Sequence, residues 1–374
     1  IIPVVSGAVL VAWAREGILD GADEGTEGGL TNWRGVLRST SAAATGAALL
    51  GALGGWLEPL AGWSARTGSA FSTDEVVALE RVVTLFRDWR TAGAGLGPSA
   101  VLGHLGDVSD RLRGAPDDAL TGRVFLAGAE LAKIAASMHF DTGAHQLSQR
   151  YYVIAVQMAT AAKQRSFAAT VLAALARQCY DLGATADGLE IVGLAQHGTR
   201  HNASPTLRAM LATRLAWGHA QRGEVYAFHR AVGAAEESFA ARQLARPEPH
   251  WLAGLDVAEM AGVIGARFRD LAHHEPTQAH HAATYISRAL ALRALARTRN
   301  RAFDLIGLAR VHLLTGEPER GCALVGEALP MIDQRHPGRV GRKLADWNRE
   351  ATRYTSLPIV RDTQDRVCAL ATAT

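Results

Sequence analysis

Apolar residues recur at steps of three and four along Phe303 to Leu329, with Gly316 in the middle of the stretch. This spacing predicts two short amphipathic helices joined by a tight turn at Gly316. Ala309 and Gly321 are small residues at facing positions, and they would let the two helix backbones approach closely. A helix pair this short cannot bury its own apolar face, so the pattern predicts that it stacks on neighbouring pairs.

The same spacing recurs upstream, around the turn glycines Gly143, Gly183 and Gly223, which stand 40 residues apart. In the third of these pairs, Phe228 occupies a position where a small residue is expected. A further pair precedes the last one, but its turn is longer and contains Pro276. The repetition predicts a row of helix pairs that share one continuous core.

The first part of the chain is also predicted to be helical. Ser72 and Glu75 have the spacing of a capping box, in which the two side chains accept hydrogen bonds from free N–H groups at a helix start. No stretch shows the alternation of a β-strand. We therefore predict an all-α chain: an array of antiparallel helix pairs with C-terminal capping helices over 117–374, a helical lead-in over 73–116, and an N-terminal helical and linker segment over 1–72.

Composition agrees with a helical protein that has a core. The chain is 48% hydrophobic and 20% charged, Ala and Leu dominate, and β-branched runs are scarce. Its net charge of +3 gives no basis for a nucleic-acid surface on this chain. Cys179, Cys322 and Cys368 lie far apart without metal-ligand spacing, which suits a reducing compartment, so we expect a cytoplasmic protein.

The stretch Ser39 to Trp63 is rich in Ala, Gly and Leu, with Glu58 as its single charge. A membrane span or a signal peptide is therefore one interpretation. Ala and Gly insert weakly into a bilayer, however, and we favour a buried helix or a connector. We expect no membrane partner. The glycine-rich stretch 91–97 is not followed by the Lys-Ser/Thr of a phosphate-binding loop, so no nucleotide site is predicted.

Over roughly Val124 to Asp333 the pattern resembles the tetratricopeptide repeat, whose unit has about 34 residues. In addition, Val77–Trp89, Glu130–Ala132, Phe140–Gly143 and Leu147–Tyr152 are similar to the C-terminal portion of actinobacterial helix-turn-helix (XRE-type) regulators. The resemblance implies a right-handed superhelical array of the tetratricopeptide type that senses a ligand or dimerises. It also implies that a DNA-binding head precedes the chain.

In the family that the chain resembles, the first helices of the pairs line a concave groove. The matching positions here carry cationic, aromatic and polar side chains. They are Lys133, Ser137, Phe140 and Asp141 in the first pair, Arg177 and Tyr180 in the second, Trp217 and Gln221 in the third, and Arg310 in the last. Arginine can hold a carboxylate through two parallel hydrogen bonds, and an aromatic face gives a large apolar contact area. The set is expected to bind a peptide or an anionic small molecule; the alternative is a solvated groove with ordinary surface ion pairs.

Histidines stand out in two groups. The denser group consists of two doublets that flank a short polar loop: His273, His274, His280 and His281. Zinc sites use three or four such ligands, but adjacent histidines on a helix point apart, so we favour a polar loop and predict no metal site. The second group recurs at one position of the helix pairs: His139, His219 and His312. There an imidazole is expected to pack at the interface of the paired helices.

None of the common catalytic sequence motifs is present, so the sequence predicts no enzyme activity, no catalytic residue and no cofactor. It favours the ligand- or peptide-sensing and dimerisation array of a cytoplasmic transcriptional regulator. DNA would be bound only through a head upstream of residue 1, and the protein would be a homodimer. A protein-interaction scaffold that binds a peptide without a DNA role is the alternative. An all-helical enzyme, with a site assembled across the fold, is a third hypothesis.

Overall fold

The computed structural model describes residues 71–92, 98–112, 115, 117–242, 248–332 and 338–372. The expectations for residues 1–70, including the stretch Ser39–Trp63, lie outside the described residues, as does most of the glycine-rich stretch 91–97. Within the described part, every regular element is a helix, which confirms the all-α prediction. None of these described helices is long and apolar enough to cross a bilayer.

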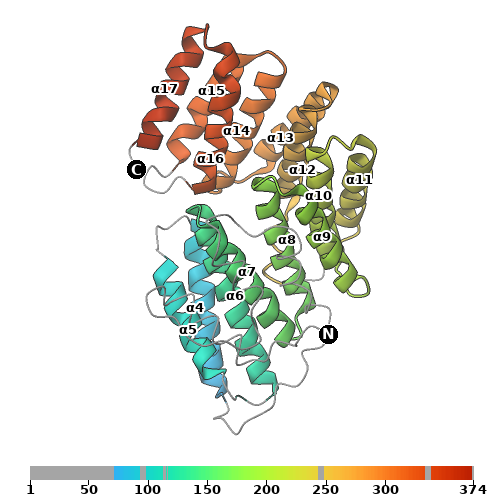
Figure 1. The fold of residues 1–374 in the computed structure, drawn as a ribbon, viewed down its shortest axis with the longest axis vertical. Coiled ribbons are helices and arrows are strands. Elements are labelled where there is room, and N and C mark those ends of the chain that lie inside the picture. The colour runs from blue at the N-terminus through green and yellow to red at the C-terminus, as the bar shows by residue number, and fades with distance from the viewer. Residues whose placement is uncertain are drawn as a thin grey trace, which may run out of the picture. The chain divides into compact units, whose positions relative to one another are not determined.

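The packing divides the chain into two units, which we call unit 1 (up to Ala203) and unit 2 (from Ser204). The described α-helices of unit 1 are α4 (Thr73–Ala92), α5 (Pro98–Arg111), α6 (Ala119–Asp141), α7 (His145–Ala161), α8 (Arg165–Asp181) and α9 (Thr185–Thr199) (Figure 1). Those of unit 2 are α10 (Pro205–Gln221), α11 (Val225–Ala240), α12 (Val257–Ala272), α13 (Ala279–Leu292), α14 (Thr298–Leu314), α15 (Pro318–Ala328), α16 (Gly338–Ala351) and α17 (Pro358–Thr372). The division falls between Ala203 and Ser204, in the segment that separates α9 from α10. The predicted limits at 72 and 116 stay predictions.

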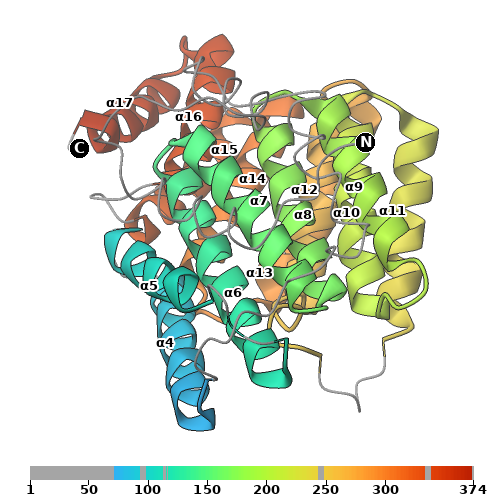
Figure 2. The same cartoon turned by 60° about the horizontal axis from the view of Figure 1, so that its bottom comes forward.

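Consecutive helices pack as pairs: α6 with α7, α8 with α9, α10 with α11, α12 with α13, and α14 with α15. In unit 1, α7 also lies against α8, and both α4 and α5 lie against α6 (Figure 2). In unit 2, α10 contacts α12, α12 contacts α14, and α14 contacts α16. Within each unit, neighbouring pairs therefore stack on one another, as the pattern predicts.

The turns inside the pairs have the geometry that their glycines allow. The four turn glycines all have left-handed φ values: Gly143 (83°), Gly183 (80°), Gly223 (67°) and Gly316 (78°). The residue after each glycine donates to the carbonyl five residues earlier, as the Glu224 N–H does to the His219 oxygen at 3.0 Å. This is a Schellman motif, which satisfies carbonyls at a helix end and requires φ > 0 at the glycine position.

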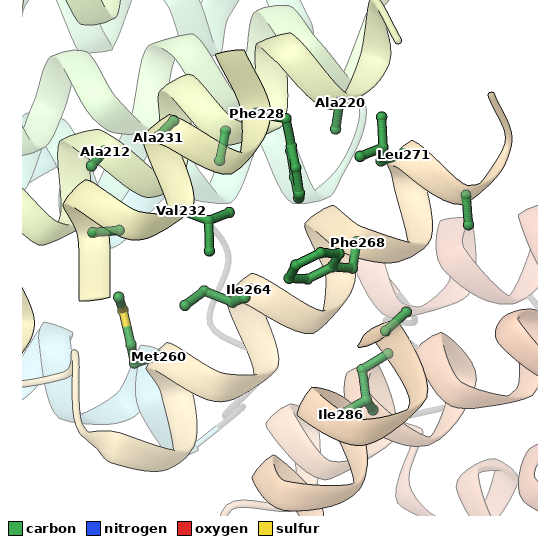
Figure 3. Packing of buried hydrophobic residues seen from close by; sticks show 14 of the residues in the cluster. Ala212, Ala220, Phe228, Ala231, Val232, Met260, Ile264, Phe268, Leu271 and Ile286 are labelled. Carbon is green, nitrogen blue, oxygen red and sulfur yellow. The ribbon is translucent and has the colours of Figure 1, made fainter. Parts of the chain in front are cut away.

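Small residues allow the close helix approach predicted for the last pair. A Cβ added to Gly321 would lie 3.0 Å from the backbone oxygen of Ala309, so α14 and α15 are nearly in backbone contact. Phe228, at the position where a small residue is expected, is buried and lies edge-on to Phe268, with ring centroids 4.9 Å apart. Figure 3 shows the two rings meeting between α11 and α12 beside Ile264. That pair therefore carries a ring where the last pair has Gly321, and the ring contacts the next pair.

The start of α4 confirms the capping box. The Ser72 N–H donates to the Glu75 carboxylate at 2.8 Å, and the Glu75 N–H donates to the Ser72 Oγ at 3.2 Å. Two N–H groups at the helix start are thereby satisfied, and α4 begins at the next residue. The cap fixes where the helix that faces α6 starts.

Candidate functional site

Basic side chains of unit 1 gather on α4, α6 and α8. Arg87 and Arg90 are three residues apart on α4 and share one of its faces. On α6, Glu130, Lys133 and Ser137 recur at steps of three and four and share a face in the same way. α6 and α8 belong to different helix pairs and α4 lies against α6, so side chains far apart in sequence meet here.

Lys133 lies at the centre of this group. Its Nζ donates to the Thr170 Oγ1 of α8 at 3.0 Å and lies 4.9 Å from the centroid of the Phe167 ring. The Thr170 hydroxyl donates in turn to the Phe167 carbonyl oxygen at 2.8 Å, so it accepts from the ammonium. Thr170 and Phe167 are buried, whereas Lys133 keeps part of its surface exposed. Among the described residues, Thr170 is the hydrogen-bond partner of Nζ.

The surroundings of Lys133 disfavour its positive charge. Burial lowers its pKa to about 8; the Glu130 carboxylate raises the pKa, and Arg177 and Arg90 lower it. Two guanidinium groups thus act on Nζ against one carboxylate. The electrostatic potential at this point favours an anion.

Two ion pairs tie α4 to α6. An Arg87 Nη1 lies 3.1 Å from a Glu130 carboxylate oxygen, and an Arg90 Nη2 lies 3.3 Å from a carboxylate oxygen of Asp141. Asp141, one of the expected groove residues, therefore contacts a cation of the neighbouring helix. The pairs are partly shielded from solvent, so they fix the position of α4 against α6 more firmly than a fully exposed pair would.

Three expected groove residues of unit 1 are part of the packed interior, and this corrects their expected place on an open surface. Ser137 lies with its Oγ 3.4 Å from the Tyr152 hydroxyl of α7, and the Phe140 ring lies 5.6 Å from that of His145. Tyr180 covers Gly188 of α9, where an added Cβ would be 2.3 Å from its ring. All three side chains turn toward the second helix of their own pair, which explains their burial.

Arg177 stays at the edge of this interior. Its Cζ lies 5.7 Å from the centroid of the Phe140 ring, within range of a cation–π contact. Phe140 therefore presents its ring face to a guanidinium and not to solvent. Two of the predicted groove residues of unit 1 therefore place a cationic group over an aromatic ring: Lys133 over Phe167, and Arg177 over Phe140.

In unit 2, Trp217 of α10 stacks with Arg267 of α12, whose Cζ lies 3.5 Å from the ring centroid. Arg267 is missing from the sequence-based set, because the long turn with Pro276 obscures the pair to which α12 belongs. Arg267 and Asp270 are three residues apart, a spacing that places both on one face of a helix, and in the structure the Arg267 Nη1 lies 3.3 Å from the Asp270 carboxylate. Gln221 lies at the end of α10, where its backbone oxygen lies 3.1 Å from His274 Nε2.

Arg310 is buried and is held by carboxylates of the next helix. Its Nε donates to Glu350 of α16 at 2.9 Å, a second bond joins the same two groups, and Asp346 lies 3.5 Å away. A paired geometry of this kind is the strongest form of an Arg–carboxylate contact. Arg310 therefore joins α14 to α16, a role that the groove prediction did not include.

The basic residues of this region of unit 2 are matched by acids. Three arginines lie near three carboxylates: Arg267, Arg269 and Arg310 with Asp270, Asp346 and Glu350. Burial opposes the charge of Asp270, but the surrounding arginines hold its pKa well below the usual range. The charged groups of this network come from α12, α14 and α16. Lys133 in unit 1 differs, because its ammonium bonds a neutral hydroxyl.

The histidine doublets separate into different contacts. His273 Nε2 lies 3.7 Å from Glu350, whereas His274 reaches the backbone of α10. The ring centroids of His280 and His281 lie 3.8 Å apart. In the described ranges, no three His, Cys, Asp or Glu side chains are arranged to hold a metal ion.

The recurring histidines contact the structure in two ways. His139 stacks on Tyr151 of α7 with ring centroids 5.4 Å apart, which is the interhelical packing that we expected. His219 and His312 instead pair across the Schellman turn with a glutamate five residues later, as the 2.8 Å between His312 Nδ1 and Glu317 shows. The signal for the second contact is the Glu that follows the turn glycine in both pairs.

Lys133 is thus a half-buried amine near two guanidinium groups, whereas the arginines of this region of unit 2 are matched by carboxylates. Comparison of the chain with models of protein families, with curated proteins and with solved structures gives no match.

Proposed function

We propose that the chain is the ligand-sensing and dimerisation array of a cytoplasmic transcriptional regulator, with a DNA-binding head upstream of residue 1. The proposal includes a right-handed superhelical arrangement of the pairs, as in tetratricopeptide repeats. The effector would be a peptide or an anionic small molecule, and DNA would be bound only through the upstream head.

The observation that supports the proposal most directly is the cationic group on α4, α6 and α8 in an array of stacked pairs. A ligand that bound this group would contact successive hairpins at once. Since neighbouring hairpins of a unit pack on one another, a change in their spacing would be passed along the stack. The ligand would thereby favour one arrangement of a dimer over another.

The test begins with the gene upstream of residue 1. The full-length protein is expressed, its mass in solution is measured by light scattering, and DNA binding is followed by mobility shift. A dimer that shifts DNA, with its midpoint altered by an effector, supports the proposal. A full-length protein without a DNA-binding domain refutes it, and a monomer that still captures a peptide would favour the scaffold alternative.

A further inference from the structure

Lysine is rare in this chain, and one of its three lysines lies in an unusual place. The basic residues number 39, of which only Lys133, Lys163 and Lys343 are lysines. Lys163 is exposed and lies 3.7 Å from the carboxylate of Asp117, and Lys343 lies 3.6 Å from that of Asp346. Lys133 alone among them has a hydroxyl as its hydrogen-bond partner.

The ammonium of Lys133 has hydrogen-bonding capacity that the described residues leave unused. It carries three N–H donors, and Thr170 accepts one of them. The Phe167 ring lies close to Nζ but accepts no conventional hydrogen bond. An ammonium held in a partly buried position without a carboxylate in contact is costly, because it has lost water without gaining an ion pair. A ligand that supplied an acceptor would recover that cost.

We propose that Lys133 is the anchor of an anion site on α4, α6 and α8, whose occupant is a carboxylate or a phosphate. The site deepens the proposed sensing function and rests on it for its biological role. Arg177 and Arg90 act on the ammonium as like charges and would attract an anion, although Arg90 also pairs with Asp141 and Glu130 acts with the opposite sign. The anion would accept hydrogen bonds from the free donors of Nζ.

Two consequences separate this site from a structural lysine. First, Lys133→Met removes a poorly solvated charge, so the free protein is expected to unfold at a higher temperature than the unmodified chain. Second, the anion binds the charged amine, whose pKa is about 8 in the free site. Affinity is therefore expected to fall about tenfold per pH unit above that value.

The experiment measures the unfolding temperature with sodium phosphate, with sodium citrate, and with sodium chloride at matched ionic strength. Phosphate, citrate or both are expected to raise the unfolding temperature more than chloride does. The anion that raises it shows whether the site binds a phosphate or a carboxylate. In Lys133→Met the affinity should fall roughly tenfold to a hundredfold, the loss of a charged hydrogen bond. The matched control, Lys343→Met, should keep the response. No response beyond chloride, or a full response in Lys133→Met, overturns the proposal.

Amine acetylation with mass spectrometry gives a second readout that needs no variant. The responding anion should slow acetylation of Lys133, while Lys163 and Lys343 react at unchanged rates. Equal rates at Lys133 with and without the anion contradict the site. If the anion binds but alters neither the dimer nor DNA binding of the full-length protein, the site stands and the sensing function fails.

Discussion

Replacing Gly265 by Ala tests the close approach of α12 to α13. A Cβ at Gly265 would lie 2.9 Å from the backbone N of Ile286, 2.6 Å from its Cγ1 and 3.0 Å from the Cβ of Tyr285. The backbone atom cannot rotate away, so α13 must shift by several tenths of an ångström. Gly233 in α11 is the matched control, because an added Cβ there meets nothing within 4 Å.

Both substitutions add the helix stability of alanine, but only Gly265→Ala also overpacks the contact between α12 and α13. Replacing a helical glycine by alanine gains about 1 kcal/mol of helix stability at either position. At Gly265, overpacking costs about 1–3 kcal/mol in addition. Gly233→Ala should therefore stabilise the protein, and Gly265→Ala should be less stable than Gly233→Ala by roughly 1–3 kcal/mol.

Urea unfolding followed by circular dichroism measures the difference, since both variants keep the helical signal of the native state. Equal slopes in urea show that the midpoints compare the same transition. Equal stabilisation of the two variants would refute the backbone contact between α12 and α13, and with it the argument that small residues set the spacing inside a pair.

Other predictions concern buried contacts. Arg310→Ala should destabilise unit 2 by about 3 kcal/mol in the same assay, because Glu350 then lacks its paired cation; an unchanged midpoint would show that the pair is immaterial. Phe228→Ala should cost about 3–4 kcal/mol by opening a cavity beside Phe268, and a loss below that of a typical surface substitution would contradict the packing in Figure 3. Burial depresses the pKa of His139 below 6.5, so it contributes stability that is present above that pH and lost as the pH falls; a pH series should show a smaller loss in His139→Phe.

The local features of the fold are readable from the sequence. Gly316 marks a turn because few other residues adopt its φ, and Gly321 marks a close contact because it has no side chain. The capping box at Ser72 is equally local. Each of these features depends on residues a few positions apart, so spacing alone is sufficient to predict them.

The candidate site is less readable, because it depends on which face of a helix the next hairpin covers. Phe140 and Tyr180 occupy positions that family geometry places on the groove, yet they pack on their own second helices. Arg267 reaches Trp217 across a pair that the long turn conceals. The low affinity of Lys133 for its proton follows from burial and neighbouring charges, which no spacing encodes.

The turn between α7 and α8 joins two different pairs, yet it repeats the geometry found inside them. Lys163 has φ 59° there, and the Gln164 N–H donates to the Ala159 oxygen at 2.9 Å. Gly143, Lys163 and Gly183 are turn residues with positive φ that follow one another at intervals of 20 residues, and each interval contains one helix and one turn. Over this part of unit 1, the repeating unit of the main chain is therefore a single helix and its turn, and side-chain contacts group the helices in pairs. Inserting or removing two helices of this part of the chain would therefore leave the turns at its ends with the same backbone geometry.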